Sequence, residues 1–435
     1  MPSLTKDRLE TFDVTEARKQ FPALSTPQIY FDNAGGSQVL KPVIDSITSY
    51  LSGSNVQLGA SYKVAREATR RYEEGYEAAA RFVGAEMDEI VIGPSTTLLF
   101  ANLAQTLHFP PDSELILSTL DHEANISPWI RLAHSQNLTI KWWSPSPSPS
   151  PSSSPTTTNP TLTTTSLLPL LSPLTALVAC THTSNILGTI HDIRALATSI
   201  HRTAPTALFC VDGVALAPHR AVNVKALGVD FYAWSWYKVY GPHLATLYAS
   251  PRARSRMASL GHFFHRGEDL RTKIGLAAGS YELIGGVGEV VRWFEGGEGG
   301  KEGVFEGIAR HEEGLQGVLL GYLNGRGDVR VLGEREPGRG ARVPVVSFVV
   351  EGRGSRGVVE KIEERSAYAC RWGHFYSKRL VDDVLGIEGR QGEEGEGVGK
   401  WEGEGVVRVS MVFYNTEEEI RGFVKVLDEV LAEQP

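Results

Sequence analysis

Short apolar runs alternate with helix-like segments along the first two thirds of this chain. The runs have the length of buried strands, and they lie at Glu89–Gly93, Glu114–Ser118, Thr139–Trp143, Thr175–Thr181, Ala207–Val211, Phe231–Trp234 and His243–Tyr248. Segments with one apolar helical face predict helices at Thr15–Phe21, Pro42–Leu51, Ala65–Val83, Leu98–Leu107 and from Ile193 onward. Strands that alternate with helices are typical of an α/β fold with a mainly parallel sheet.

The composition changes after about residue 295 and again within one earlier stretch. Glycine- and glutamate-rich pieces lie at Glu295–Gly303, Gly333–Gly340 and Gly386–Gly405, and they alternate with helix-like runs and the strand Val343–Val350. The earlier stretch, Ser144–Thr165, is rich in serine, proline and threonine. Neither composition buries much apolar area, so we expect solvated surface loops in these places.

Polar side chains follow two of the buried strands. Ala207–Val211 ends at Asp212, and Phe231–Trp234 ends at Ser235, Tyr237 and Lys238. Because open α/β sheets bind ligands at the carboxyl ends of their strands, we expect these groups to lie at one edge. Pyridoxal 5′-phosphate (PLP) chemistry requires this set: a lysine condenses with the aldehyde, a carboxylate keeps the pyridine nitrogen protonated, and hydroxyls hold the phosphate.

The neighbours of Lys238 support this interpretation. An isolated lysine is usually a solvated surface charge, and an aspartate at a strand end is often only a turn former. Here Trp234, Trp236, Tyr237 and Tyr240 surround the lysine in the sequence. Such a setting removes water from the amine, which lowers its pKa and makes it a nucleophile.

Four further motifs carry candidate binding groups. The hydroxyls of Ser95, Thr96 and Thr97 precede a helix and can bind an anion together with free backbone amides, although capping alone explains one of them. His122 follows another strand, where a histidine is more often structural than catalytic. Asn185 lies in a turn after Thr175–Thr181, and the turn Asp32–Ser37 contains the small residues Ala34 and Gly35, which let backbone approach a ligand.

Composition and charge narrow the possible functions. The chain has 435 residues, a formal net charge of −8 and no basic stripe, which argues against nucleic-acid or anionic-membrane binding. Its three cysteines are too few and too scattered for a disulfide frame or a metal site. The polar first residues and the absence of a long apolar run predict a soluble, cytoplasmic protein that acts on a small molecule.

The segment Ser235–His243, SWYKVYGPH, resembles the lysine motif of the class V aminotransferase family, which includes the cysteine desulfurases. The turn at Asp32, the strings DHEAN and HTSNILGT, and the C-terminal VRVS are also similar to that family. The resemblance implies PLP-dependent transferase fold type I: a large PLP-binding α/β domain over 26–295 with a seven-stranded-type sheet, and a small α+β domain formed by 1–25 and 296–435. The low-complexity loop 144–165 lies within the large domain. It also implies a homodimer and PLP as the cofactor.

The same resemblance assigns roles to individual residues. Lys238 would form the Schiff base with the cofactor, Asp212 would contact the pyridine nitrogen, and His122 would stack on the ring. Arg408 would bind the substrate α-carboxylate, a task suited to a bidentate guanidinium. Asn185 would contact the cofactor phenolic oxygen or the substrate, and the backbone of Ala34 and Gly35 would lie beside the substrate carboxylate. The cofactor phosphate would be bound by Ser95, Thr96, Thr97, Ser235 and Tyr237.

Four positions depart from the pattern of the cysteine desulfurases. Tyr376 stands where they carry the nucleophilic cysteine, and Tyr237 replaces the histidine before the lysine. Val214-Ala215 replaces an alanine-glutamine pair, and Ala277-Ala278 replaces the glycine-threonine pair that reaches the partner's phosphate. A persulfide mechanism needs a thiolate, so desulfurase activity is not favoured.

These departures resemble a fungal decarboxylative aldolase branch of the family. That resemblance implies removal of the β-carboxyl of L-aspartate and addition of the resulting nucleophile to an aldehyde, which gives a γ-hydroxy-α-amino acid. Two alternatives stay open: a cysteine desulfurase, selenocysteine lyase or other C–S lyase, and a PLP-binding protein without catalysis. If Trp234, Trp236 and Phe375 line the site, we expect their aromatic side chains to exclude water from it.

Overall fold

The computed structural model describes residues 12–145, 159–276, 279–387 and 405–433 of the chain. Within these residues, a large sheet of seven strands has the order β2-β8-β7-β6-β5-β3-β4. Its strands are β2 (Ile90–Gly93), β3 (Glu114–Ser118), β4 (Thr139–Trp143), β5 (Thr175–Thr181), β6 (Leu208–Asp212), β7 (Phe231–Ser235) and β8 (Ala245–Ala249). Strand β8 runs antiparallel to β2 and β7, and the other pairs are parallel. The mainly parallel sheet that the sequence predicted is confirmed.

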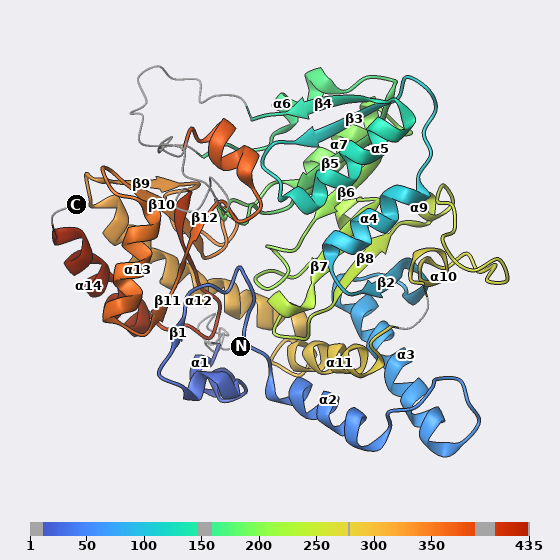
Figure 1. Ribbon diagram of the computed structural model, residues 1–435, viewed down its shortest axis with the longest axis horizontal. Helices are drawn as coiled ribbons and strands as arrows, with labels where there is room; N and C mark the ends of the chain where they lie inside the picture. The colour runs from blue at the N-terminus through green and yellow to red at the C-terminus, as the bar shows by residue number, and fades with distance from the viewer. Residues whose placement is uncertain (1–11, 146–158, 277–278, 388–404, 434–435) are drawn as a thin grey trace, which may run out of the picture.

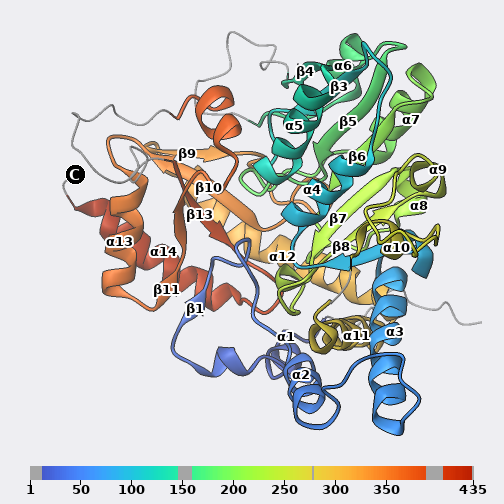
Figure 2. The ribbon, with the colours of Figure 1, turned by 45° about the vertical axis from the view of Figure 1, so that its right-hand side comes forward.

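Helices cover both faces of the large sheet (Figures 1 and 2). On β5, Leu177 and Ala179 pack with α4 (Thr96–Thr106) and α5 (Ser127–Gln136), whereas Val178 and Cys180 belong to the core of the opposite face. That opposite face is covered by α3 (Lys63–Val83), α7 (Ile193–Thr203) and α11 (Tyr281–Glu295). Because both faces are buried, the central strands are apolar throughout rather than alternating.

A small sheet lies beside the large one, on the left in Figure 1. Among the described residues it has four antiparallel strands in the order β12-β13-β10-β9. These are β9 (Val329–Leu332), β10 (Val345–Val350), β12 (Arg371–Gly373) and β13 (Val406–Ser410), packed with α12 (Gly300–Asn324), α13 (Ser355–Arg365) and α14 (Glu417–Ala432). Strand β1 (Ile29–Tyr30) pairs with β11 (Tyr368–Ala369), so the N-terminal segment crosses to this side.

The remaining helices are short or lie at the periphery. They are α1 (Val14–Arg18), α2 (Lys41–Gly53), α6 (Thr164–Leu167), α8 (Val224–Leu227), α9 (Pro251–Arg254) and α10 (Leu270–Ile274). None of the helices in the described part of the chain is both long and apolar enough to cross a bilayer.

Two of the expected surface loops differ in part from the sequence-based expectation. Gly300–Gly303, expected to be loop, forms the first turn of α12, because Val304, Phe305 and Ile308 bury a continuous apolar stripe that outweighs the poor helix propensity of glycine. Leu162, near the end of 144–165, is buried. Most of that stretch, most of 386–405 and the pair Ala277-Ala278 lie outside the described residues.

Gly213, directly after β6, lies in close contact with a side chain of the neighbouring strand β7. A Cβ at this position would lie 2.1 Å from the ring of Tyr232, which is fully buried and whose hydroxyl lies 3.0 Å from Nδ1 of His182. The ring therefore has little freedom to move away. We predict that Gly213→Ala lowers the free energy of unfolding by about 1–3 kcal/mol, as overpacking does, in urea denaturation.

Gly317 provides the matched control because a Cβ added at this position of α12 would meet no described atom within 4 Å. Gly317→Ala should leave stability unchanged or raise it, since alanine has the better helix propensity. Equal effects of the two substitutions would contradict the packing argument.

Candidate active site

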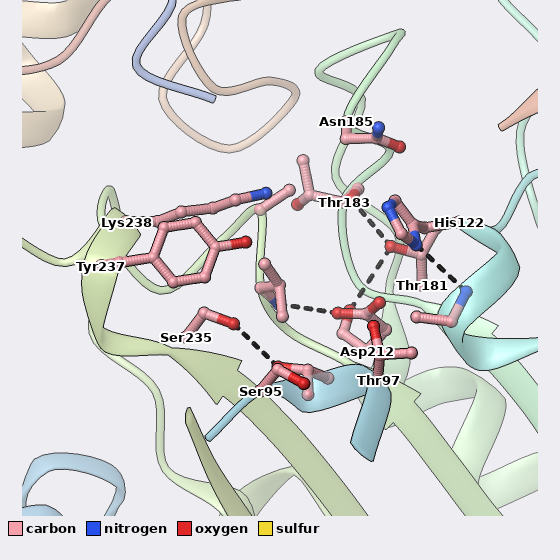
Figure 3. A pocket seen from close by; sticks show the side chains of 14 residues that line it. Ser95, Thr97, His122, Thr181, Thr183, Asn185, Asp212, Ser235, Tyr237 and Lys238 are labelled. Atoms are coloured by element: carbon pink, nitrogen blue, oxygen red, sulfur yellow. Dashed lines mark hydrogen bonds between the residues drawn. The ribbon is translucent and has the colours of Figure 1, made fainter. Parts of the chain in front are cut away.

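The carboxyl ends of β5, β6 and β7 and the segments after β2 and β3 meet at one edge of the large sheet and enclose a cavity (Figure 3). Its empty volume is about 500 Å³, a figure that includes space open to solvent. The lining residues are Ser95, Thr96, Thr97, His122, Ala124, Thr181, Thr183, Asn185, Asp212, Val214, Ala215, Ser235, Tyr237 and Lys238. The structure thus brings together nine side chains that the sequence marked as candidates, as the parallel topology requires.

Hydroxyl groups gather on one side of this cavity. Ser95 caps α4 by accepting the N–H of Leu98 at 3.2 Å, and Thr96 Oγ1 lies 2.8 Å from Oγ of Ser235, at the end of β7. Thr97 adds another hydroxyl on the first turn of α4. The N-terminus of this helix carries unpaired N–H groups and a partial positive charge, so the cluster suits a phosphate.

Asp212 is the last residue of β6 and is buried. Its Oδ1 accepts the backbone N–H of Val214 at 2.9 Å. Burial raises the pKa of Asp212 to about 6, while this hydrogen bond and the charge of Lys238 oppose the rise. A carboxylate that gains from a nearby positive charge is well placed to hold a protonated pyridine nitrogen.

His122 follows β3 and presents a neutral ring to the cavity. Nδ1 accepts the N–H of Ala124 at 3.1 Å, so in the neutral ring the proton lies on Nε2. Burial, followed by the positive charges of Lys238 and Arg408, lowers the pKa of His122 to about 3. An uncharged, flat imidazole fits the stacking role that the resemblance implied.

Lys238 lies on a short 3₁₀ turn, Trp236–Lys238, directly after β7. Within the described residues its Nζ forms no hydrogen bond or ion pair, and the ring of Tyr237 lies 5.8 Å away. Burial, followed by the charge of Arg408, lowers the pKa of Lys238 to about 8, while the charges of Asp212 and Asp32 oppose the fall. Ser37 fixes the turn by donating its N–H to the carbonyl of Tyr237 at 3.0 Å.

Trp234, Trp236 and Phe375 are not among the residues that line the cavity, so they do not form the aromatic wall that the sequence suggested. Both indoles are fully buried on the core side of β7 and pack against Phe82 of α3. The N–H of Trp236 donates to Oγ1 of Thr246 at 2.8 Å. Trp234 lies on the face of β7 that is opposite to Ser235, because side chains alternate along a strand, and Trp236 begins the 3₁₀ turn after the strand.

Arg408, Ala34 and Gly35 lie beside the cavity and are not part of its lining. Arg408, on β13, is buried and donates from Nη2 to Oδ1 of Asp32 at 2.7 Å. The N–H of Ala34 donates to Oγ of Ser410 at 2.9 Å, which holds the N-terminal turn against the small sheet. The sequence placed Asp32 in this turn but gave it no role.

A loop from the small sheet reaches the cavity through Asn185. The amide of Asn185 donates to the carbonyl of Phe375 at 3.0 Å and accepts from Oγ of Ser377 at 2.9 Å. The ring of Tyr376 lies 5.1 Å from that of His122. The side chain expected to bind cofactor or substrate is therefore engaged by this loop, although it still lines the cavity.

The comparisons with known proteins agree with this geometry. The family described as aminotransferase class V matches residues 29–423. Aminotransferase-like protein FGM3 of Gibberella zeae is 48% identical over 97% of this chain and 99% of that protein, and the cysteine desulfurase-like protein ustD of Aspergillus flavus is 40% identical over 96% and 91%. The apo cysteine desulfurase of Thermococcus onnurineus has a TM-score of 0.80 at 25% identity and covers 99% of each chain.

This chain belongs to the class V aminotransferase family. Its fold is that of the fold type I PLP-dependent enzymes, as the sequence predicted. The cofactor that this family membership indicates, pyridoxal 5′-phosphate, fits the residues present: hydroxyls at a helix N-terminus, a buried carboxylate, a neutral imidazole and a buried lysine amine. When bound, PLP supplies an aldehyde for the amine and an electron-accepting ring.

The pKa of Lys238 predicts the pH dependence of cofactor uptake. Only the neutral amine attacks the aldehyde, and burial lowers its pKa from 10.5 to about 8. The rate at which cofactor-free protein takes up PLP should therefore rise with pH and level off above about pH 8, followed by visible absorbance. A rate that keeps rising toward pH 10.5 would contradict the shift.

The variant Arg408→Met tests the cause of this shift. Removing a positive neighbour should raise the pKa of Lys238 and move the uptake midpoint to higher pH. Arg421→Met, which removes an exposed charge on α14, is the matched control and should leave the midpoint unchanged.

Proposed function

We propose that this protein is a PLP-dependent enzyme that removes the β-carboxyl of L-aspartate as carbon dioxide and adds the resulting carbon nucleophile to an aldehyde. The product is a γ-hydroxy-α-amino acid. One observation carries the proposal: the lysine, carboxylate and imidazole of a PLP site are assembled, and Tyr376, not a thiol, faces His122. This reaction requires no cysteine.

Lys238 is the proton carrier in this proposal. Its pKa of about 8 leaves a usable fraction of neutral amine near neutral pH, so Nζ can take the proton from Cα and later return one. Asp212 would hold the pyridine nitrogen of bound PLP in its protonated form, and the cofactor would then supply an electron-accepting ring. His122 would stack on that ring as a neutral imidazole.

The small domain proposed for residues 1–25 and 296–435 supplies the carboxylate-binding group. Arg408 would bind the α-carboxylate of the amino acid through two N–H donors. Phe375, whose ring lies 3.7 Å from this guanidinium, and Tyr376, whose ring lies 5.1 Å from that of His122, would limit the access of water to these two groups. Exclusion of water favours attack on the aldehyde over protonation of the nucleophile.

The thiols of the chain do not favour cysteine desulfurase activity. Cys180 and Cys210 lie within the strands of the large sheet and are fully buried. Burial raises the pKa of Cys370 to about 12, and that of Cys180 and Cys210 well above the ordinary value. None of the three can supply a thiolate to a substrate at neutral pH.

Mass spectrometry of reaction mixtures tests the proposal. The cofactor-loaded protein should convert L-aspartate and an aromatic aldehyde into a product with the mass of aspartate minus carbon dioxide plus aldehyde. Lys238→Ala should lower the rate by at least about 100-fold because the proton carrier is lost. Lys41→Ala, at an exposed lysine paired with Asp45, should retain activity.

A different result separates the alternatives. If L-aspartate is unchanged while L-cysteine yields alanine and sulfide, the protein is a desulfurase and the aldolase proposal is wrong. If neither amino acid reacts and the visible band still forms, the aldolase and desulfurase alternatives are both wrong, and a different C–S lyase or a PLP-binding protein without catalysis remains.

We also propose that the chain acts as a homodimer. Three large apolar side chains between β8 and α11 are exposed: Phe263, 90%, Phe264, 61%, and Leu276, 57%. Such a concentration of exposed apolar area is typical of an interaction site. Sedimentation should therefore report a dimer, and Phe263→Ser with Phe264→Ser should shift it toward monomer. A monomeric parent protein would contradict this proposal.

A further inference from the structure

A shared carboxylate lies between two arginines next to the cavity. Oδ1 of Asp32 accepts from Nη2 of Arg408 at 2.7 Å, and Oδ2 lies 3.4 Å from Nη1 of Arg371. Arg371 on β12 is the direct cross-strand partner of Arg408 on β13. Both guanidinium groups also face the ring of Phe375, at 3.7 Å for Arg408 and 5.4 Å for Arg371. Asp32 therefore offsets two like charges that the sheet register places side by side.

The guanidinium of Arg408 is incompletely satisfied in this arrangement. Nη1 reaches only the carbonyl of Asn185 at 3.4 Å, and Nε is buried without a hydrogen-bond partner in the described part of the chain. Nε and Nη2 point along the same edge of a guanidinium, which is the edge that binds carboxylates with two parallel hydrogen bonds. Asp32 uses one of these two donors, so the stronger bidentate contact is left unmade.

Arg371 offers a second position for the same carboxylate. Asp32 lies nearer to Arg408, at 2.7 Å, than to Arg371, at 3.4 Å, and the side chain of Arg371 is 57% exposed whereas that of Arg408 is 2% exposed. Gly35 leaves space around the carboxylate, since a Cβ there would lie 2.9 Å from Oδ2. The carboxylate can therefore turn between its neighbours without displacing the backbone.

We propose that Asp32 occupies the place of the substrate α-carboxylate on Arg408 and moves to Arg371 when an amino acid binds. This inference rests on the proposed role of Arg408. Before binding, two cations share one anion; after binding, each guanidinium has its own carboxylate. Asp32 and Arg371 are thus positioning residues that set the affinity for the α-carboxylate of any amino-acid substrate.

Binding of propionate to the holoenzyme, measured by calorimetry, tests the exchange, because propionate has a carboxylate and no amine. Asp32→Asn removes the competing anion and should lower the Kd roughly tenfold. Arg371→Met removes the position to which Asp32 moves and should raise the Kd several-fold. In the Asp32→Asn background, Arg371→Met should change the Kd by less than about twofold, since no anion is left to relocate.

Asp45→Asn and Arg421→Met, at exposed ion pairs on α2 and α14, are matched controls that should leave the Kd unchanged. A rise in Kd for Asp32→Asn would overturn the proposal, because it would mean that Asp32 orients Arg408 for the ligand. Equal effects of Arg371→Met in both backgrounds would overturn it as well.

Thermal unfolding confirms that each variant is folded, and Arg371→Met, at a half-exposed side chain, provides the independent arm if Asp32→Asn does not fold. Titration with L-alanine, followed by the visible absorbance of the cofactor, should give the same order of affinities. Propionate binding involves no decarboxylation, so failure of the aldolase assay and failure of the exchange are separate results.

Discussion

A lysine amine loses most of its hydration when it is buried, and this loss governs the arrangement of charges around Lys238. The charged form would need a close anion, yet Asp212 and Asp32 act on it only at a distance, and Arg408 repels it. The pKa therefore falls, and a neutral nucleophile is present near neutral pH. The groups around Lys238 are subject to the same constraint: burial lowers the pKa of His122 to about 3 and raises that of Asp212 to about 6.

The parallel sheet makes this arrangement possible because it places five chain segments at one edge. Each contributes one chemical type: hydroxyls after β2, an imidazole after β3, polar residues after β5, a carboxylate at β6 and an amine after β7. Short, fully buried strands fix their ends within the packed core, so the polar groups keep their spacing. The site thus depends on the same apolar runs that form the fold.

Much of this could be predicted from the sequence, since β3, β4 and β5 have the bounds that their apolar runs indicated. The residues of the cavity were found because strand ends of a parallel sheet share an edge. Contacts between distant segments could not be predicted in this way. Asp32 and Arg408 are 376 positions apart, and they meet because the N-terminal turn packs on β13. The orientation of Trp234 required the side-chain alternation of β7, which an all-apolar run does not reveal.

The loop that carries Tyr376, where the cysteine desulfurases have a cysteine, is held in a strained backbone conformation. Phe375 and Tyr376 both have positive φ, at 47° and 59°, a conformation that costs bulky residues of order 1–3 kcal/mol each. Contacts from both sheets offset this strain: Asn185 binds the Phe375 carbonyl, the N–H of Glu123 donates to the carbonyl of Tyr376 at 2.8 Å, and Arg408 stacks on Phe375. A nucleophilic arm has to move toward its substrate, whereas a loop fixed from both sides is suited to form a wall. The ring of Tyr376 lies 5.1 Å from that of His122 and is 69% exposed, so it covers the imidazole from the solvent side.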